Sequence, residues 1–284
     1  MASPVVDIHP HIVSKDTTKY PITPLGGTRS DWSSERGVDA EQMIAAMAEA
    51  GVDKMAMVHS STTYGFECGY CADMVAKYPN KFTGVFSIDV TAADGPQKMR
   101  YWFSRGCTGQ RIFTRGSTMK DAWVAIDDPK LFPCYEVAEE LGIAVALNPQ
   151  VKKFNELETI LKQFPKVNFV LENLGKSDFT DGAPFNNAKP LWDLSRFPNL
   201  YLKIKTENNL QSLKGKSTPE TMFAKIVSIY GANRMAWGSN YPASKGALKE
   251  LTDIARQTYA SLPQSDQDWI LGKTALKLYP ALAK

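Results

Sequence analysis

Apolar runs rich in β-branched residues alternate with helix-like segments along the whole chain of 284 residues. Each run has the length of a strand, and the segment after it carries apolar residues at helical spacing. Strands that alternate with helices of about ten residues predict parallel βαβ units. Eight strands are expected, at Val5–His11, Met55–Ser61, Phe82–Asp89, Thr108–Thr114, Ile143–Asn148, Asn168–Leu174, Leu200–Thr206 and Met235–Ser239.

Most of the expected helices end at glycine or proline, the residues that commonly mark a helix end. Gly51, Gly142 and Gly231 follow three of them, and Pro79 and Pro165 follow two others. The helices are expected at Ala40–Ala50, Cys71–Tyr78, Gly95–Ser104, Leu131–Leu141, Phe154–Phe164, Lys189–Arg196, Pro219–Tyr230, Ala247–Ser261 and Gln267–Tyr279.

Eight such units predict an α/β protein with one domain over residues 1–284, a closed (β/α)8 TIM barrel. The length fits, because these barrels run to roughly 250 residues. No glycine-rich dinucleotide fingerprint follows the first expected strand, which argues against an open doubly wound sheet. The connections that follow strands lie on the catalytic face of a barrel. Several of them are long, at Ile12–Asp39, Arg115–Pro129, Gly175–Ala188 and Glu207–Thr218.

The charge balance and hydropathy exclude several classes of protein. The chain has 33 Lys+Arg against 30 Asp+Glu and no block of basic residues, so we expect no nucleic acid partner. No apolar stretch is long enough to span a bilayer, and the N-terminus lacks the pattern of a signal peptide. We therefore expect a cytoplasmic protein with no membrane partner. The sequence leaves the oligomeric state open.

Two of the three histidines lie in the segment Asp7-Ile8-His9-Pro10-His11, at the end of the first expected strand. Residues two apart on a strand point to the same side, so Asp7, His9 and His11 are expected to share one face. The C-terminal ends of barrel strands border the catalytic pocket. We therefore predict that His9 and His11 begin an active site and are not merely hydrogen-bonded structural histidines.

The Asp-x-His-x-His segment resembles the opening motif of the amidohydrolase superfamily. Four further segments resemble its amidohydrolase 2 group, which includes 2-pyrone-4,6-dicarboxylate lactonase and related lactonases. They are Tyr78–Phe82, Phe169–Lys176, Arg234–Pro242 and Ile270–Tyr279. The resemblance keeps the order of these segments over nearly the whole chain. It implies a (β/α)8 barrel and a hydrolase that acts on a small carboxylated substrate.

Three positions depart from the pattern of that family. Asn173 stands at the strand-six histidine, and Asn240 stands at the strand-eight aspartate, the family's usual base. Asn148 stands where metal-bearing members have a strand-five histidine. His9 and His11 alone supply fewer than the three good ligands that a catalytic zinc needs. The resembling lactonases also work without metal. We therefore predict no metal and no cofactor, with a zinc ion at His9 and His11 as the alternative.

The asparagines also change the expected chemistry. Asparagine cannot act as a general base near neutral pH, but it can orient water or donate to an oxyanion. Imidazole titrates near neutrality, so His9 or His11 is expected to be the base. Asn173 and Asn240 would then position the carbonyl group or the water.

Two lysines alternate with Tyr201 along the expected seventh strand, so Lys203 and Lys205 should share one face. A lysine inside a barrel is unfavourable unless it is paired. Lys203 could bind a substrate carboxylate, act as a base at a lowered pKa, or form a salt bridge with Asp7 or Glu172, and these alternatives stay open. Lys205 is nearer the mouth, so we expect it to contact the substrate.

Further binding residues are expected where other strands end. In the resembling lactonases, basic residues of the strand-four region hold substrate carboxylates, which suits Arg111 and its bidentate geometry. Arg115, in the loop, could bind the substrate in the same way or be merely solvated. Ser61, Tyr64 and Asn148 are expected to supply polar contacts to the substrate.

The leading hypothesis is a metal-independent hydrolase that opens a lactone or similar ring of a small carboxylated, aromatic-derived substrate. Within enzymes the alternative is a decarboxylase or hydratase of the same group, and the decarboxylases usually bind a metal. The alternative from another class is a non-catalytic binding protein on the same scaffold.

Overall fold

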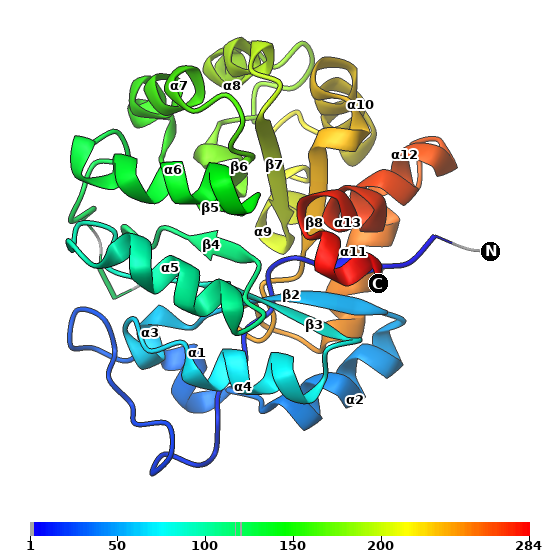
Figure 1. Ribbon diagram of the computed structural model, residues 1–284. Helices are drawn as coiled ribbons and strands as arrows, with labels where there is room; N and C mark the ends of the chain where they lie inside the picture. Colours follow the sequence, from blue (N-terminus) through cyan, green and yellow to red (C-terminus); the bar gives the residue numbers. More distant parts are fainter. Residues whose placement is uncertain (1–2, 117, 120) are drawn as a thin grey trace.

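The computed structural model describes residues 3–116, 118–119 and 121–284, and within them eight parallel strands pair in sequential order. The last strand returns to the first. Ile8 N donates to Trp237 O at 3.2 Å, and Ser239 N donates to Asp7 Oδ1 at 2.9 Å. These contacts close a single-domain (β/α)8 TIM barrel, as predicted (Figure 1). The strands are β1 (Val6–Asp7), β2 (Lys54–Val58), β3 (Phe82–Phe86), β4 (Gly109–Arg111), β5 (Ala144–Leu147), β6 (Phe169–Glu172), β7 (Leu200–Lys205) and β8 (Met235–Gly238).

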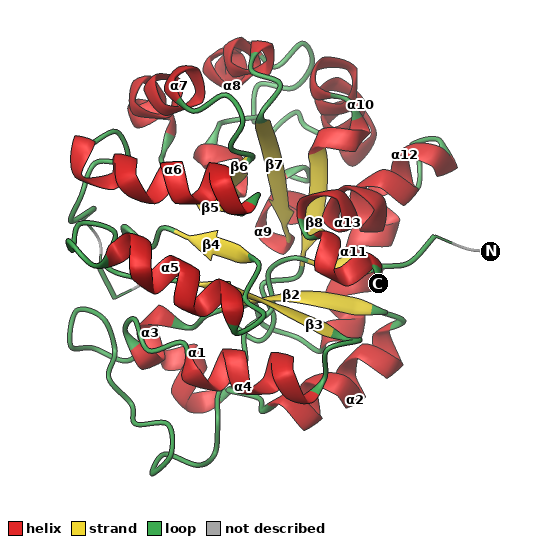
Figure 2. Ribbon diagram, in the orientation of Figure 1, coloured by secondary structure: helices red, strands yellow, loops and turns green. Residues whose placement is uncertain are grey.

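Helices surround the strands, as Figure 2 shows. In the helix over Ala40–Ala50, Asp39 accepts a hydrogen bond from Gln42 N, Met43 and Met47 are buried, and Gly51 ends the helix with a φ of 63°. The helices are α1 (Asp31–Glu35), α2 (Ala40–Ala50), α3 (Ser61–Tyr64), α4 (Gly69–Lys77), α5 (Gly95–Ser104), α6 (Phe132–Leu141), α7 (Phe154–Gln163), α8 (Lys189–Asp193), α9 (Thr206–Gln211), α10 (Pro219–Tyr230), α11 (Leu248–Tyr259), α12 (Gln264–Asp268) and α13 (Thr274–Leu278).

The observed elements are shorter than the expected ones at several ends. Strand β1 ends at Asp7, because the chain bends at Ile8, and β2 ends at Val58, directly before the polar run that begins with His59. The helix expected at Gln267–Tyr279 is present as a continuous helical run that consists of α12, a π-helical turn at Trp269–Lys273 and α13. Short helices α1, α3 and α9 lie in connections that the sequence did not predict to be helical.

One end of the barrel is filled by apolar side chains. Small and β-branched residues from the strands, such as Ala146 and Val170, pack with Tyr279 and Leu282 from the end of the chain. Lys54, which begins β2, donates through Nζ to Leu282 O at 2.6 Å. The C-terminal segment therefore covers the N-terminal ends of the strands (Figure 1). The opposite end, where the strands finish, is left for a site.

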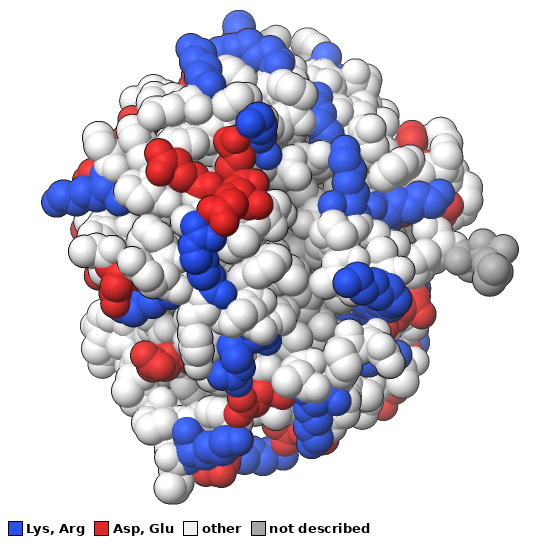
Figure 3. Space-filling model, viewed as in Figure 1, with Lys and Arg blue, Asp and Glu red and all other residues white. Residues whose placement is uncertain are grey.

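Charges of both signs are interspersed over the face shown in Figure 3. The acidic residues over α6 are partly paired, because Arg100 contacts Glu140 and Lys166 contacts Glu139. Among the described residues, no helix has the length and apolar character needed to cross a membrane.

Candidate active site

A cavity of about 400 Å³ lies at the C-terminal ends of the strands. This volume is in the range of small-molecule sites. Residues from nearly every strand end contribute to its wall. The described lining residues are His9, His11, Trp32, His59, Ser60, Ser61, Thr62, Arg111, Phe113, Arg115, Gly116, Asn148, Asn173, Lys176, Lys205, Glu207, Asn240 and Ala243.

His9 and His11 lie side by side in this cavity, with ring centroids 5.0 Å apart and planes at 89°. The chain bends at Ile8, and Asp7 does not line the cavity with them. The Asp7 carboxylate instead accepts the His9 N–H at 2.9 Å, as well as the Ser239 N–H that joins β1 to β8. Asp7 therefore holds the backbone on which the two histidines stand.

His11 and His59 are fixed by backbone carbonyl groups. His11 Nδ1 lies 2.8 Å from Val58 O, and His59 Nε2 lies 2.9 Å from Gly65 O. Burial, with a contribution from a nearby arginine, lowers the pKa of His11 to about 3. Burial likewise lowers the pKa of His59 to about 4. Both rings are therefore neutral at neutral pH.

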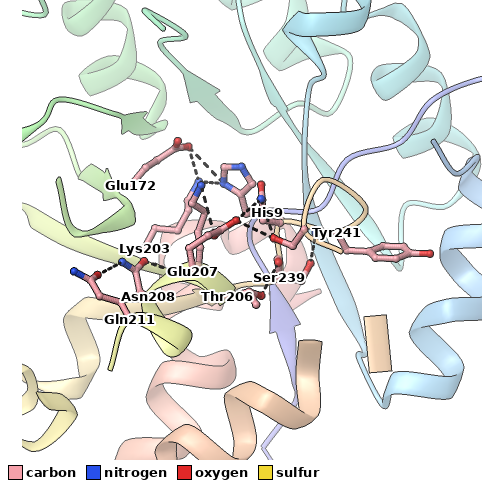
Figure 4. Close-up of polar contacts among 12 residues, drawn as sticks. His9, Glu172, Lys203, Thr206, Glu207, Asn208, Gln211, Ser239 and Tyr241 are labelled. Atoms are coloured by element: carbon pink, nitrogen blue, oxygen red, sulfur yellow. Dashed lines mark hydrogen bonds and ion pairs between the residues drawn. The ribbon is translucent and has the colours of Figure 1, made fainter. Parts of the chain in front are cut away.

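A buried cluster of charged side chains lies next to His9, and Figure 4 shows Glu172, Lys203 and His9 pointing toward one another. Lys203 Nζ is 3.2 Å from Glu172 Oε1 and 3.1 Å from His9 Nδ1. Arg111 Nη2 donates to Glu172 Oε2 at 2.8 Å. Of the alternatives for Lys203, the structure shows the salt bridge, with Glu172 rather than Asp7 as its partner.

The charges of this cluster stabilise one another. Burial acts to raise the pKa of Glu172, but Arg111 and Lys203 outweigh it and hold the pKa at about 2. Burial lowers the pKa of Lys203 to about 8, against the opposing effect of Glu172. Burial and then the Lys203 charge hold the pKa of His9 well below its usual range. At neutral pH the cluster therefore contains two cations, one carboxylate and a neutral imidazole.

Positive charge dominates the cavity wall. Arg111, Arg115, Lys176 and Lys205 line it, and Glu207 is the one carboxylate among the described lining residues. Arg111 Nε is buried and has no hydrogen-bond partner among the described residues. The cavity therefore favours an anionic ligand. The expectation that Arg111, Arg115 and Lys205 lie together at one site agrees with these positions.

The three asparagines named from the sequence also come together at the cavity. Asn173 and Asn240 adopt left-handed backbone conformations with φ of 55° and 60°, which asparagine tolerates better than most residues. Asn240 Nδ2 donates to Glu207 Oε1 at 2.9 Å and to Ser244 Oγ at 3.0 Å. Asn148 lines this cavity and also a neighbouring one of about 330 Å³.

Ser61 and Tyr64, at the two ends of α3, are placed differently. Ser61 lines the cavity, and its Oγ is buried with no hydrogen-bond partner among the described residues. Tyr64 does not line the cavity, because α3 carries it one turn away from Ser61. Its hydroxyl accepts the Ser14 N–H at 2.7 Å, and its side chain borders a separate cavity of about 230 Å³.

Several lining residues were not predicted from the sequence, among them Trp32, Lys176 and Glu207. Trp32, on α1, lies with its ring centroid 5.1 Å from that of His11. Lys176 follows β6, and Glu207 lies on α9 directly after β7. A carboxylate so soon after a strand end was a signal that could have identified Glu207. Trp32 lies in a long connection without a motif, so only the folded chain shows that it lines the cavity.

The histidine pair does not fit a catalytic zinc ion. His11 Nδ1 is occupied by Val58 O, and His9 Nδ1 faces the Lys203 ammonium group. Only the two Nε2 atoms remain, whereas a catalytic zinc takes three protein ligands. Within residues 3–116, 118–119 and 121–284, no group of three His, Cys, Asp or Glu side chains is placed to hold a metal ion. The adjacent cations also repel a divalent ion.

Comparisons with known proteins agree with this architecture. A candidate 2-pyrone-4,6-dicarboxylic acid hydrolase from Pseudomonas putida is 18% identical, covers 99% of both chains and has a TM-score of 0.78. An amidohydrolase from Burkholderia multivorans with bound zinc is 15% identical over 98% of this chain and 99% of its own, with a TM-score of 0.75. The 5-carboxyvanillate decarboxylase from Sphingomonas paucimobilis is 14% identical over 98% and 99%, with a TM-score of 0.69.

At these identities the solved structures show a likeness of fold. Curated protein sequences give no significant match. The family model described as amidohydrolase, however, matches residues 6–281, nearly the whole chain. The chain therefore belongs to the amidohydrolase family and is an enzyme of that family, as its sequence motifs predicted.

Proposed function

We propose that the enzyme is a metal-independent, cytosolic hydrolase that opens a lactone or similar ring of a small carboxylated, aromatic-derived substrate. The observation that carries the proposal is the combination of the neutral His9 and His11 imidazoles with four cations in one cavity. Imidazoles can move protons at an ester carbonyl, and cations can hold carboxylates. The similarity to a candidate 2-pyrone-4,6-dicarboxylic acid hydrolase supports this substrate class.

In the proposed reaction, Arg111, Arg115 and Lys205 hold the substrate carboxylates. The histidine pair takes a proton from water and returns it to the ring oxygen, while Asn173 and Asn240 orient the water or the carbonyl group. A carboxylate bound to Arg111 cancels part of the positive charge that lowers the pKa of His11. Substrate binding therefore makes His11 a better base.

Decarboxylation and hydration are the alternatives within this family. One similar structure is a 5-carboxyvanillate decarboxylase, and another amidohydrolase holds zinc. Decarboxylases of this group usually bind a metal ion. The site around His9 and His11 offers a divalent ion only two nitrogen ligands, next to the cations Lys203 and Arg111, so it favours hydrolysis without a metal.

The test is an assay of the purified enzyme with 2-pyrone-4,6-dicarboxylic acid and with lactones that lack carboxylates. We expect turnover of the carboxylated lactone, with no loss after treatment with a chelator. His9→Ala and His11→Ala should each lower kcat by about 10²-fold or more. Release of carbon dioxide from carboxylated phenols, together with stoichiometric zinc or manganese in the protein, would identify a decarboxylase instead.

A further inference from the structure

His9 and His11 make different contacts through the same ring atom. Nδ1 of His11 faces a carbonyl oxygen, whereas Nδ1 of His9 faces an ammonium group. Among the described residues, the Nε2 atom of neither ring has a hydrogen-bond partner within the protein, and both rings line the cavity. The contact at Nδ1 therefore decides whether Nε2 presents an N–H group or a lone pair to a ligand.

The state of His11 follows from its contact with Val58. A carbonyl oxygen can only accept a hydrogen bond, so His11 Nδ1 must carry the proton and donate it at 2.8 Å. The ring is buried and neutral, so it holds one proton. His11 Nε2 therefore presents a lone pair to the cavity.

The state of His9 is the opposite. A lysine ammonium group can only donate, so His9 Nδ1 must accept the hydrogen bond from Lys203 Nζ at 3.1 Å. The other candidate partner of Nδ1 is Glu172 Oε1, at the longer distance of 3.5 Å. A carboxylate oxygen can accept more than one hydrogen bond, so the distances decide, and Lys203 Nζ is the nearer group to His9 Nδ1. His9 Nε2 therefore carries the ring proton and presents an N–H group to the cavity.

We infer that Lys203 is a positioning residue that fixes His9 as a hydrogen-bond donor, while Val58 fixes His11 as an acceptor, so that the two histidines have different roles. Glu172 supports this arrangement because it holds the Lys203 ammonium group at 3.2 Å. The catalytic meaning of the assignment rests on the proposed function. The two tautomers themselves are properties of the free enzyme.

The assignment gives a balanced course for ring opening. His11 Nε2 takes a proton from water while the water oxygen bonds to the lactone carbonyl carbon. The carbonyl oxygen becomes an oxyanion and accepts a hydrogen bond from His9 Nε2–H. When the carbonyl re-forms, the bond to the ring oxygen breaks and that oxygen takes the proton from His11. The product is a ring-opened hydroxy acid, and both histidines return to their starting states.

Nitrogen NMR of the ring atoms tests the assignment directly, because protonated and lone-pair ring nitrogens resonate in well-separated regions. The three histidines can be assigned with His9→Gln, His11→Gln and His59→Gln variants. In the substrate-free enzyme near pH 7, we expect the proton on Nε2 of His9 and on Nδ1 of His11. His59 should carry it on Nε2, since this atom faces Gly65 O, and it serves as an internal reference.

Lys203→Met should release His9 from this state, so that its Nδ1 becomes protonated and donates to Glu172, while His11 keeps its tautomer. The variant should lower kcat by about 10²-fold with little change in KM, as for the loss of an oxyanion donor. Lys205→Met is the matched control, because it removes a lysine from the same strand two residues away. It should raise KM and leave the tautomers of all three histidines unchanged.

A proton on Nδ1 of His9 or on Nε2 of His11 in the unmodified enzyme would overturn the inference, and this result does not depend on how Lys203→Met folds. Correct tautomers without turnover of any carboxylated lactone would reject the proposed function and leave the assignment of the rings intact. Turnover with the opposite tautomers would reject the assignment alone.

Discussion

The charged residues of the site form two layers that differ in how closely their members pair with one another. The deep layer, made of His9, Arg111, Glu172 and Lys203, is buried, and its members contact one another at 2.8 to 3.2 Å. The outer layer, made of Arg115, Lys176, Lys205 and Glu207, is partly or fully exposed. Within the outer layer, Lys205 Nζ and Glu207 Oε2 lie 4.0 Å apart. The deep layer therefore sets positions and protonation states, and only its His9 and Arg111 also line the cavity, whereas every member of the outer layer is available to bind a ligand.

The largest expected effect comes from removing the one carboxylate of the deep layer. Glu172→Gln leaves Arg111 and Lys203 buried without a counter-charge, so we expect the free energy of unfolding to fall by about 3–5 kcal/mol. Urea denaturation measures this change. Glu207→Gln is the matched control in the outer layer and should change stability by about 0.5 kcal/mol or less. Equal losses in the two variants would remove the distinction between the layers.

Substitutions in the outer layer should weaken substrate binding rather than lower the free energy of unfolding. Arg115→Gln and Lys205→Met should each raise KM for a carboxylated lactone by about 10- to 100-fold, since a hydrogen bond to a charged group contributes about 1.5–3 kcal/mol. Steady-state kinetics with a carboxylated lactone and an uncarboxylated one separate this effect from general damage. The comparison fails if KM rises equally for both substrates.

The buried histidines make stability depend on pH in a defined direction. His59 has a pKa of about 4 in the folded enzyme, against 6.5 when exposed. The unfolded chain therefore binds more protons as pH falls below about 6.5, and the folded state loses about 1.4 kcal/mol per pH unit for this histidine. His59→Gln should flatten the decline between pH 6 and pH 5 by this amount, measured by urea denaturation at each pH. Parallel curves for the two proteins would show that His59 is not held neutral by burial.

Much of the fold was predictable because a parallel barrel repeats one local pattern eight times. The periodicity of apolar residues shows where strands and helices lie, as for β2 and α2. It does not show where a strand leaves the ladder, because His59, Ser60 and Ser61 follow Val58 with no glycine or proline to mark the end. Helices α1 and α9 were missed, since they are short and lie in connections that only the folded barrel supports.

The sequence predicted the site residues that lie at strand ends, but it did not predict which of them are buried and paired. His9, Arg111 and Lys205 follow from the rule that the ends of parallel strands meet at one face. The alternation along β7 gave the face of Lys203, but not its burial against Glu172. Tyr64 was expected at the cavity because it follows β2 closely, and the turn of α3 carries it elsewhere.

Variants at the two ends of α3 test how far the ligand-binding surface extends along this helix. Tyr64→Phe removes the acceptor of the Ser14 N–H, so stability should fall by about 1 kcal/mol while kcat and KM stay within about twofold. Ser61→Ala should do the reverse: its Oγ has no hydrogen-bond partner among the described residues, so its loss should leave stability unchanged and lower kcat/KM several-fold. Denaturation and kinetics on the same two proteins give both readings. A loss of turnover in Tyr64→Phe as large as in Ser61→Ala would extend the binding surface beyond the cavity, because only a ligand that reaches past α3 could connect the two side chains.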